Sequence, residues 1–236
     1  MPSPNDNMSL KDGNDNPFKM RAKDVSAAQD GSLQRVLHLA SPFPVDYGVG
    51  GCYKFALRSG QMSAGLGANS PVFSLRNTSS TLLVILRKLR FNMWTNSTPF
   101  ASGTNMTFET FIARNFTASD SGGSGVNLTG KNGAQRTAMA SSALGDLRVA
   151  STATLTAGTR TLDQNAFATV VAGAPTAAGV SMNPSGPIIL YDRGVDEHPL
   201  VLAQNEGIVL QATMPATGVW SFQIDPSWDE VPLNNF

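Results

Sequence analysis

The chain has 236 residues, 41% of them hydrophobic and only 14% charged, and its 17 basic and 17 acidic residues give a formal charge of zero. That hydrophobic content excludes a disordered chain, and without a basic excess we expect no direct binding of nucleic acid. The single cysteine, Cys52, excludes an internal disulfide, and the longest strongly apolar run, 82–86, is far shorter than the roughly 20 residues that cross a membrane.

The polar N-terminus predicts an extended arm over residues 1–31, because it carries three prolines and shows no apolar period. It lacks the basic and apolar run of a secretory signal, so we expect a soluble protein that stays in the cytoplasm where it is made. The apolar positions within residues 32–40 fit either one face of a helix or a strand, and the short length of the segment favours a strand. Residues 32–236 are expected to form one β domain.

From residue 53 onward the apolar pattern predicts strands. Tyr53, Phe55 and Leu57 alternate with polar or small residues, and a short strand follows at 71–76. The segment 81–95 (TLLVILRKLRFNMWT) begins apolar on both faces and then alternates. This pattern predicts a strand that is buried on both sides at its start and half exposed at its end.

The segment 105–116 predicts a second long strand, and the linker TNSTPFASG predicts that it forms a hairpin with 81–95. One face of this second strand should be apolar: Met106, Phe108, Ile112 and Phe116.

The first strand of this predicted hairpin carries the one dense basic cluster, Arg87, Lys88 and Arg90. Alternation places Lys88 and Arg90 on one face and Arg87 on the apolar side. The cluster fits a patch for a phosphate or an acidic partner, or a solvated strand end whose cations pair with neighbours such as Glu109; the second interpretation is favoured.

Residues 117–150 are rich in Gly, Ser and Asn and predict a long excursion, either a projecting loop or an interface element. Short strands are expected after it, at 152–162, 167–172, 187–191 and 199–203. About ten strands with turn signals and no long helix predict an all-β jelly roll or β-sandwich.

The last clear pattern lies between Gly207 and Trp228 and predicts a hairpin that closes the core. Seven even-numbered residues should face inward: Ile208, Leu210, Ala212, Met214, Trp220, Phe222 and Ile224. An odd-length loop or a bulge around 215–218 would join the strands, with Gly218 supplying a positive φ. Pro226 should end the hydrogen-bond ladder and leave Trp228 available to a partner.

Patterns that could carry chemistry are weak, so no catalytic, cofactor-binding or metal-binding residue is expected. The string GVNLTGKN has P-loop spacing but places Asn132 where the motif needs Ser or Thr, and no buried strand precedes it. His38 and His198 have no second ligand at metal spacing. His198 with Asp192 or Asp196 could complete a catalytic triad, but DRGVDEHP fits a polar turn better.

Two regions resemble structural proteins of tailed bacteriophages: Met8–Leu39 resembles an N-terminal pattern of virion proteins, and Pro199–Val231 resembles the closing strands of phage jelly-roll domains. The resemblance implies a protein of the virion, assembled in the host cytoplasm. Together with the low charge, it favours a capsid decoration or cement protein that stabilises the head. A tail, collar or receptor-binding component is the alternative, and a carbohydrate-binding module that uses an outward tryptophan is the second.

The expected partners are the major capsid protein or other virion proteins, and the chain is expected to form a homo-oligomer, a trimer or a dimer. In the arm, Pro17, Phe18 and Met20 would contact a neighbour and become ordered on contact. Trp228 is the fourth expected partner-contact residue.

Overall fold

The computed structural model describes residues 10–11, 17–18, 51–63, 65–135, 140–194 and 198–233. Contacts divide the chain into two units, Met1–Ser41 and Pro42–Phe236. In the first unit, β1 (Leu10–Lys11) and β2 (Pro17–Phe18) pair antiparallel, so that Leu10 lies opposite Phe18. The strand expected at 32–40 lies outside the described residues.

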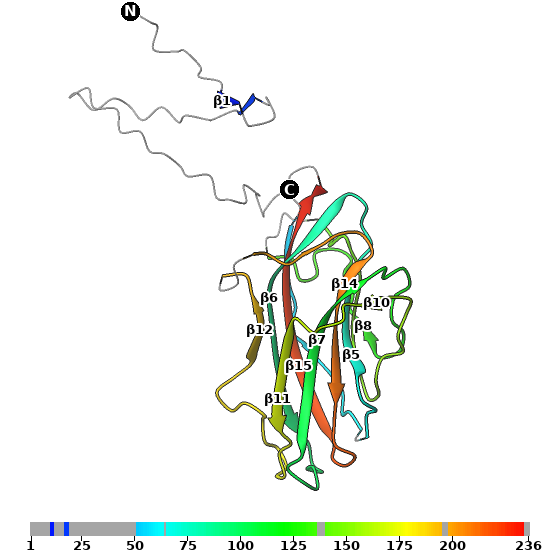
Figure 1. Cartoon of the computed structure of the whole chain (residues 1–236), viewed down its shortest axis with the longest axis vertical. Helices are drawn as coiled ribbons and strands as arrows, with labels where there is room; N and C mark the ends of the chain where they lie inside the picture. Colours follow the sequence, from blue (N-terminus) through cyan, green and yellow to red (C-terminus); the bar gives the residue numbers. More distant parts are fainter. Residues whose placement is uncertain are drawn as a thin grey trace, which may run out of the picture. The chain divides into compact units, whose positions relative to one another are not determined.

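The second unit is a sandwich of two antiparallel sheets, which confirms the predicted all-β fold (Figure 1). The β7 sheet has the strand order β10/β11–β7–β14–β5–β9–β8, and the β6 sheet has the order β12/β13–β6–β15–β3/β4. The strands are β3 (Gly51–Lys54), β4 (Leu57–Arg58), β5 (Ser70–Asn77), β6 (Leu82–Thr95), β7 (Asn105–Arg114), β8 (Ser124–Gly125), β9 (Leu144–Val149), β10 (Thr161–Leu162), β11 (Ala168–Gly173), β12 (Ile188–Asp192), β13 (Val201–Leu202), β14 (Glu206–Thr213) and β15 (Trp220–Pro232). The described residues contain no helix that could span a membrane.

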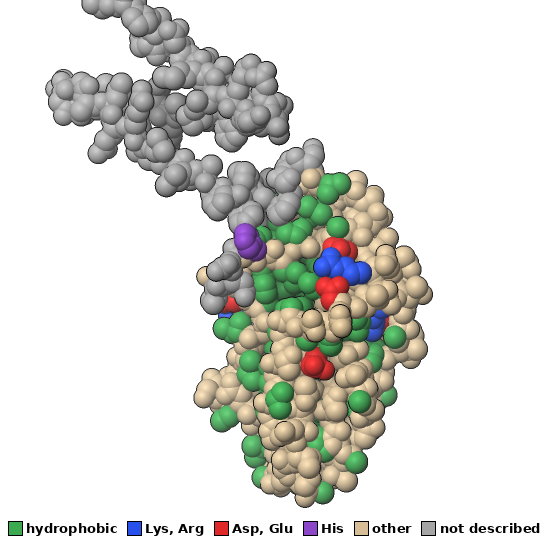
Figure 2. All heavy atoms as spheres, viewed as in Figure 1, with side chains coloured by type: hydrophobic (Ala, Val, Ile, Leu, Met, Phe, Trp, Pro, Cys, Tyr) green, Lys and Arg blue, Asp and Glu red, His purple; other side chains and the backbone are tan. Residues whose placement is uncertain are grey.

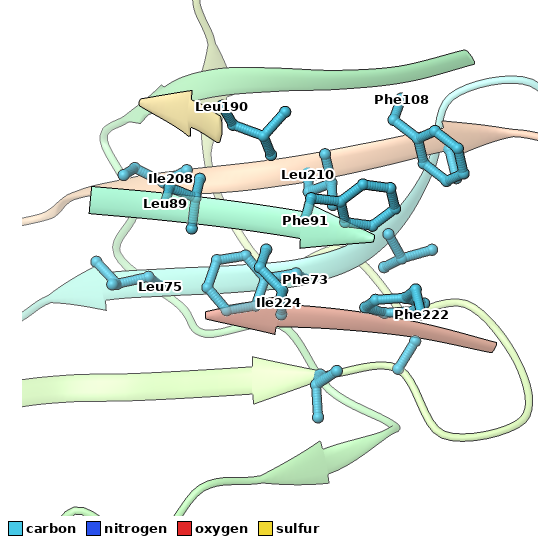
Figure 3. Packing of buried hydrophobic residues seen from close by; sticks show 14 of the residues in the cluster. Phe73, Leu75, Leu89, Phe91, Phe108, Leu190, Ile208, Leu210, Phe222 and Ile224 are labelled. Carbon is cyan, nitrogen blue, oxygen red and sulfur yellow. The ribbon is translucent and has the colours of Figure 1, made fainter. Parts of the chain in front are cut away.

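The strand β6 follows the pattern that its sequence predicts. Its residues 83–86 are all buried, and from Leu89 onward buried and half-buried positions alternate. Side chains from β6 and β15 meet those from β5, β7 and β14 between the sheets, and Figure 3 shows Phe91 and Phe222 on one side of this core with Phe73 and Phe108 on the other. The sandwich is therefore held by an apolar layer to which both sheets contribute.

The seven residues of 207–228 that were predicted to face inward are all buried. The predicted hairpin between the two strands is nevertheless wrong, because β14 pairs with β5 and β7, whereas β15 pairs with β6, β3 and β4. The chain crosses from one sheet to the other at 214–219, where Gly218 has the expected positive φ of 101°. The apolar side chains of β14 and β15 therefore point into the core from opposite sheets.

The predicted hairpin of 81–95 with 105–116 is wrong for the same reason, because β6 and β7 belong to different sheets. Met106 and Phe108 face the core as expected. Phe116 does not: Asn115 has a φ of 49°, which turns the chain, and Phe116 packs with Ala113 and Val209 in a separate cluster.

Two arginines lie over the Phe116 ring of this second cluster: Arg76 on β5 and Arg160, which directly precedes β10. The guanidinium carbons of Arg76 and Arg160 lie 5.8 and 5.2 Å from the centre of the Phe116 ring. Burial lowers the pKa of Arg160 to about 10, so that it stays charged at neutral pH, and the buried Asp120 carboxylate forms an ion pair with it. This pair fastens the start of the 117–150 segment, and the segment ends in β9, an integral strand paired with β5, rather than in a loop.

Pro226 does not end the ladder of β15, which was the predicted reason for an available Trp228. Pairing with β6 continues to Pro232, and Trp228 lies opposite Leu86. The Trp228 side chain is fully buried and stacks on Tyr53 and Phe55, with ring centres 5.7 Å apart in both cases.

Candidate functional site

The outer face of the β6 sheet carries a hollow of about 410 Å³ in which basic side chains gather. Strand register brings four of its polar residues into one row across the sheet: Asp192 lies opposite Lys88, Lys88 opposite Ser227, and Ser227 opposite Lys54. We name this site the basic hollow. Its lining consists of Lys54, Arg87, Lys88, Arg90, Gln135, Asp192, Arg193, Gly194, Asp225 and Ser227.

A bulge in β6 gives the basic hollow one more cation than alternation predicts. Ser227 pairs with Lys88 and the next residue of β15, Trp228, pairs with Leu86, which leaves Arg87 as the extra residue of β6. Arg87 and Lys88 therefore both lie outside the core. The prediction that Arg87 points to the apolar side is wrong, because it assumed an unbroken alternation.

A buried carboxylate holds two of the cations in place. Asp229 is 1% exposed, and its Oδ2 lies 2.6 Å from Arg193 Nη1 and 3.8 Å from Arg87 Nε. Arg87 also donates a hydrogen bond to Gln135 Oε1 at 2.7 Å, and the backbone N–H of Arg193 donates to the carbonyl of Arg87. The two guanidinium groups are thereby fixed at the margin of the hollow before any ligand arrives.

Lys88 is held in a similar way, with its Nζ 2.5 Å from Asp192 Oδ2. The pKa of Asp192 is lowered, first by this hydrogen bond from Lys88, then by the backbone N–H of Gly194, with Lys88 and Arg90 adding to the effect through their charges. The predicted pairing with Glu109 does not occur, because Glu109 lies on β7 in the other sheet. Asp192 is thus held in an ion pair with Lys88.

The positive charges of the other two cations, Lys54 and Arg90, remain available to a ligand. In the part of the chain that the structure describes, neither Lys54 nor Arg90 forms an ion pair. Lys54 is exposed on β3, and Arg90 is half-buried on β6 beside Asp225. Five cations and three carboxylates leave the site with an excess of two positive charges on a chain that is neutral overall. The arrangement can therefore hold an anion, most directly a carboxylate or another oxyanion.

Of the four expected partner-contact residues, Pro17 and Phe18 form β2 in the first unit, and Met20 lies outside the described residues. Trp228 is buried in the second unit. Sequence reasoning found Arg87, Lys88 and Arg90 and missed Lys54 and Arg193. Lys54 stands on the polar side of an alternating strand, which is a usable signal, but the pairing of β3 with β15 could not be inferred from that signal alone.

Other kinds of site find less support. Among the residues described, no group of three His, Cys, Asp or Glu side chains could hold a metal ion. The third tryptophan, Trp94, is half-buried on β6 opposite Ser221 and lies outside the core cluster. Comparisons with known protein families, with characterised proteins and with solved structures find no match to this chain.

Proposed function

We propose that this chain is a structural protein of a tailed-phage particle, most concretely a capsid decoration or cement protein, and that it is not an enzyme. The observation that supports this proposal best is a surface poor in charge. Figure 2 shows a face on which neutral polar and apolar atoms prevail and charged side chains gather in a few places, one of them over β10 and β14. The central parts of protein–protein interfaces are similarly depleted in charge.

The margin of the sandwich offers a second feature that supports assembly. The outermost strands β11 and β12 lie near each other at the same side of the two sheets, and each exposes a large apolar residue, Val171 (58%) and Ile189 (54%). An edge strand with exposed apolar side chains is a surface onto which a neighbouring chain can add. A decoration protein would bury this edge between capsid subunits and add interface area that resists internal pressure.

Co-sedimentation of the purified chain with expanded empty capsids, made from the major capsid protein of the same genome, tests the proposal. The chain should sediment with capsids at a fixed stoichiometry, and Val171→Asp combined with Ile189→Asp should reduce the bound amount at least fivefold. A variant without residues 1–31 should also bind much more weakly. No binding of the full chain would overturn the head assignment, and immunogold labelling of whole particles would then show whether the chain belongs to the tail or collar.

Trp94 favours a carbohydrate-binding module as the second candidate, because it is the tryptophan on the outer face of a strand. Its neighbour on that face is the half-buried Asn92, whereas Ser221, opposite Trp94, is buried and already hydrogen-bonds to Gly60 and Asn96. A glycan array with the native chain and with Trp94→Ala tests this candidate: binding that disappears in the variant would support it, and the absence of binding by the native chain would exclude it for the glycans on the array.

A further inference from the structure

The two unpaired cations of the basic hollow lie on either side of β15. Lys54 is opposite Ser227 on one flank, and Arg90 is opposite Asp225 on the other. Two strand spacings and an offset of two residues put their Cα atoms about 12 Å apart. An extended peptide covers about the same distance in three to four residues.

The remaining three cations add a fixed positive field around this pair. Arg87 and Arg193 are anchored by the buried Asp229, and Lys88 by Asp192. Because these side chains are already ordered, a ligand loses less conformational entropy on binding than it would at a patch of mobile lysines. Ser227 lies between Lys54 and Lys88 in the row, and it is only 9% exposed.

We propose that the basic hollow binds an acidic, extended segment of a partner protein, with two carboxylates four residues apart, on the same face of the extended chain, meeting Lys54 and Arg90. This inference rests on the proposed assembly function, since it names the chemistry of the partner. A nucleic acid fits less well, because an excess of two positive charges neutralises few phosphates. The Asp225 carboxylate in the lining can also accept a backbone N–H of the peptide.

Fluorescence anisotropy with labelled twelve-residue peptides tests the inference. One peptide carries Glu at every fourth position among Ser, Thr and Gly, and its matched control carries Gln at those positions. The native chain should bind the Glu peptide at least tenfold more tightly than the Gln peptide at 150 mM salt, and the affinity should fall about tenfold at 500 mM salt because the charges are solvent-accessible.

Two charge reversals then assign the binding to this hollow. Lys54→Glu and Arg90→Glu should each weaken binding of the Glu peptide about fivefold or more, and the two together should abolish it. Arg58→Glu is the matched control, because Arg58 is an exposed cation on the neighbouring β4 that does not line the hollow; it should change the affinity less than twofold. Lys54 is exposed and unpaired in the described structure, so the unfolding midpoint of Lys54→Glu should equal that of the native chain.

Several results would overturn the inference: equal binding of the Glu and Gln peptides, unchanged affinity in the double reversal, or tighter binding of a dT12 oligonucleotide or a heparin oligosaccharide than of the Glu peptide. These outcomes differ from a failure of the proposed function. A chain that binds the Glu peptide but no capsid would retain the hollow's assignment and lose the decoration role. If the native chain and the double charge reversal bind capsids equally well, the decoration role stands and the proposed ligand of the basic hollow does not.

Discussion

Arg193 and Asp229 form an ion pair, with 2.6 Å between Nη1 and Oδ2, that joins the turn after β12 to the last third of β15. Asp229 is buried, and Arg87 approaches the same oxygen from the bulge of β6. A single carboxylate thus links three neighbouring strands of one sheet through their side chains.

Replacing that carboxylate should destabilise the sheet. We expect Asp229→Asn to lower the free energy of unfolding by about 2 kcal/mol, since two partly exposed guanidinium groups lose their buried partner. Asp225→Asn is the matched control: Asp225 is half-buried on the same strand and accepts hydrogen bonds from Gln223, so its loss should cost less than about 0.5 kcal/mol. Urea unfolding measures both, and equal costs would contradict the anchoring role of Asp229.

The buried position of Trp228 leads to a second prediction. Trp228→Ala should cost about 3 to 5 kcal/mol, because it removes the ring that stacks on Tyr53 and Phe55 and leaves a large cavity. Trp94→Ala, on the outer face, should cost about 1 kcal/mol. Thermal unfolding of the two variants compares them directly, and a similar loss in both would show that Trp228 is more accessible than its burial implies.

Adding a single methyl group at Gly207 should destabilise the fold. A Cβ at Gly207 would lie 2.1 Å from the carbonyl oxygen of Leu75, on the neighbouring β5, and 2.8 Å from a carbon of Phe116. Gly207→Ala should therefore lower the free energy of unfolding by about 3 kcal/mol. Gly103→Ala is the control, because nothing lies within 4 Å of its Cβ, and it should be neutral or slightly stabilising. Equal stability of the two variants in urea would show that β5 and β14 can separate at little cost.

Tyr53 predicts a loss of stability at alkaline pH. Burial raises its pKa from 10.0 to about 12, helped by the charges of Glu230 and Cys52, and its hydroxyl donates a hydrogen bond to the carbonyl of Ala140. Between pH 10 and 12 the unfolded chain releases this proton before the folded chain does. The contribution is therefore complete below pH 10 and falls by about 2 to 3 kcal/mol as the pH rises to 12.

Tyr53→Phe isolates that contribution from the other groups that titrate in the same range. Near pH 8 the variant should be less stable by about 1 kcal/mol, the usual contribution of one hydrogen bond. Urea unfolding of both chains from pH 8 to pH 12 should show this difference shrinking and then changing sign above pH 10. Parallel pH profiles would mean that Tyr53 titrates normally.

The inward faces of the strands could be predicted from the sequence, but their partners could not. Ile208 and Trp220 were both expected to point into the core, and both do. A pattern of inward-facing side chains, however, is equally compatible with two strands that form a hairpin in one sheet and with two strands that face each other across the core. Alternation is a local property, whereas the crossing of the chain between the sheets depends on which distant strands are available to pair.

The candidate site could be predicted only in part for a related reason. Arg87, Lys88 and Arg90 are neighbours in the sequence, so their charge is visible without a structure. Lys54 and Arg193 join them through the pairing of β3 with β15 and of β12 with β6. The bulge at Arg87 has no signal in the alternation of residues, and it is what turns this side chain toward the others.

The central place of β15 in its sheet has a consequence for biosynthesis. This strand pairs with β6 on one side and with β3 and β4 on the other, so those three strands have no shared neighbour until residues 220–232 exist. β12 and β13 can pair with one edge of β6 before that point, but the edge of β6 that pairs with β15 has no partner strand while the ribosome adds the preceding residues. We therefore expect this sandwich to fold only after translation has passed residue 232, slowly, as sheets built from distant pairings do. In a cell, a chaperone that shields β6 until that moment would raise the yield of folded protein.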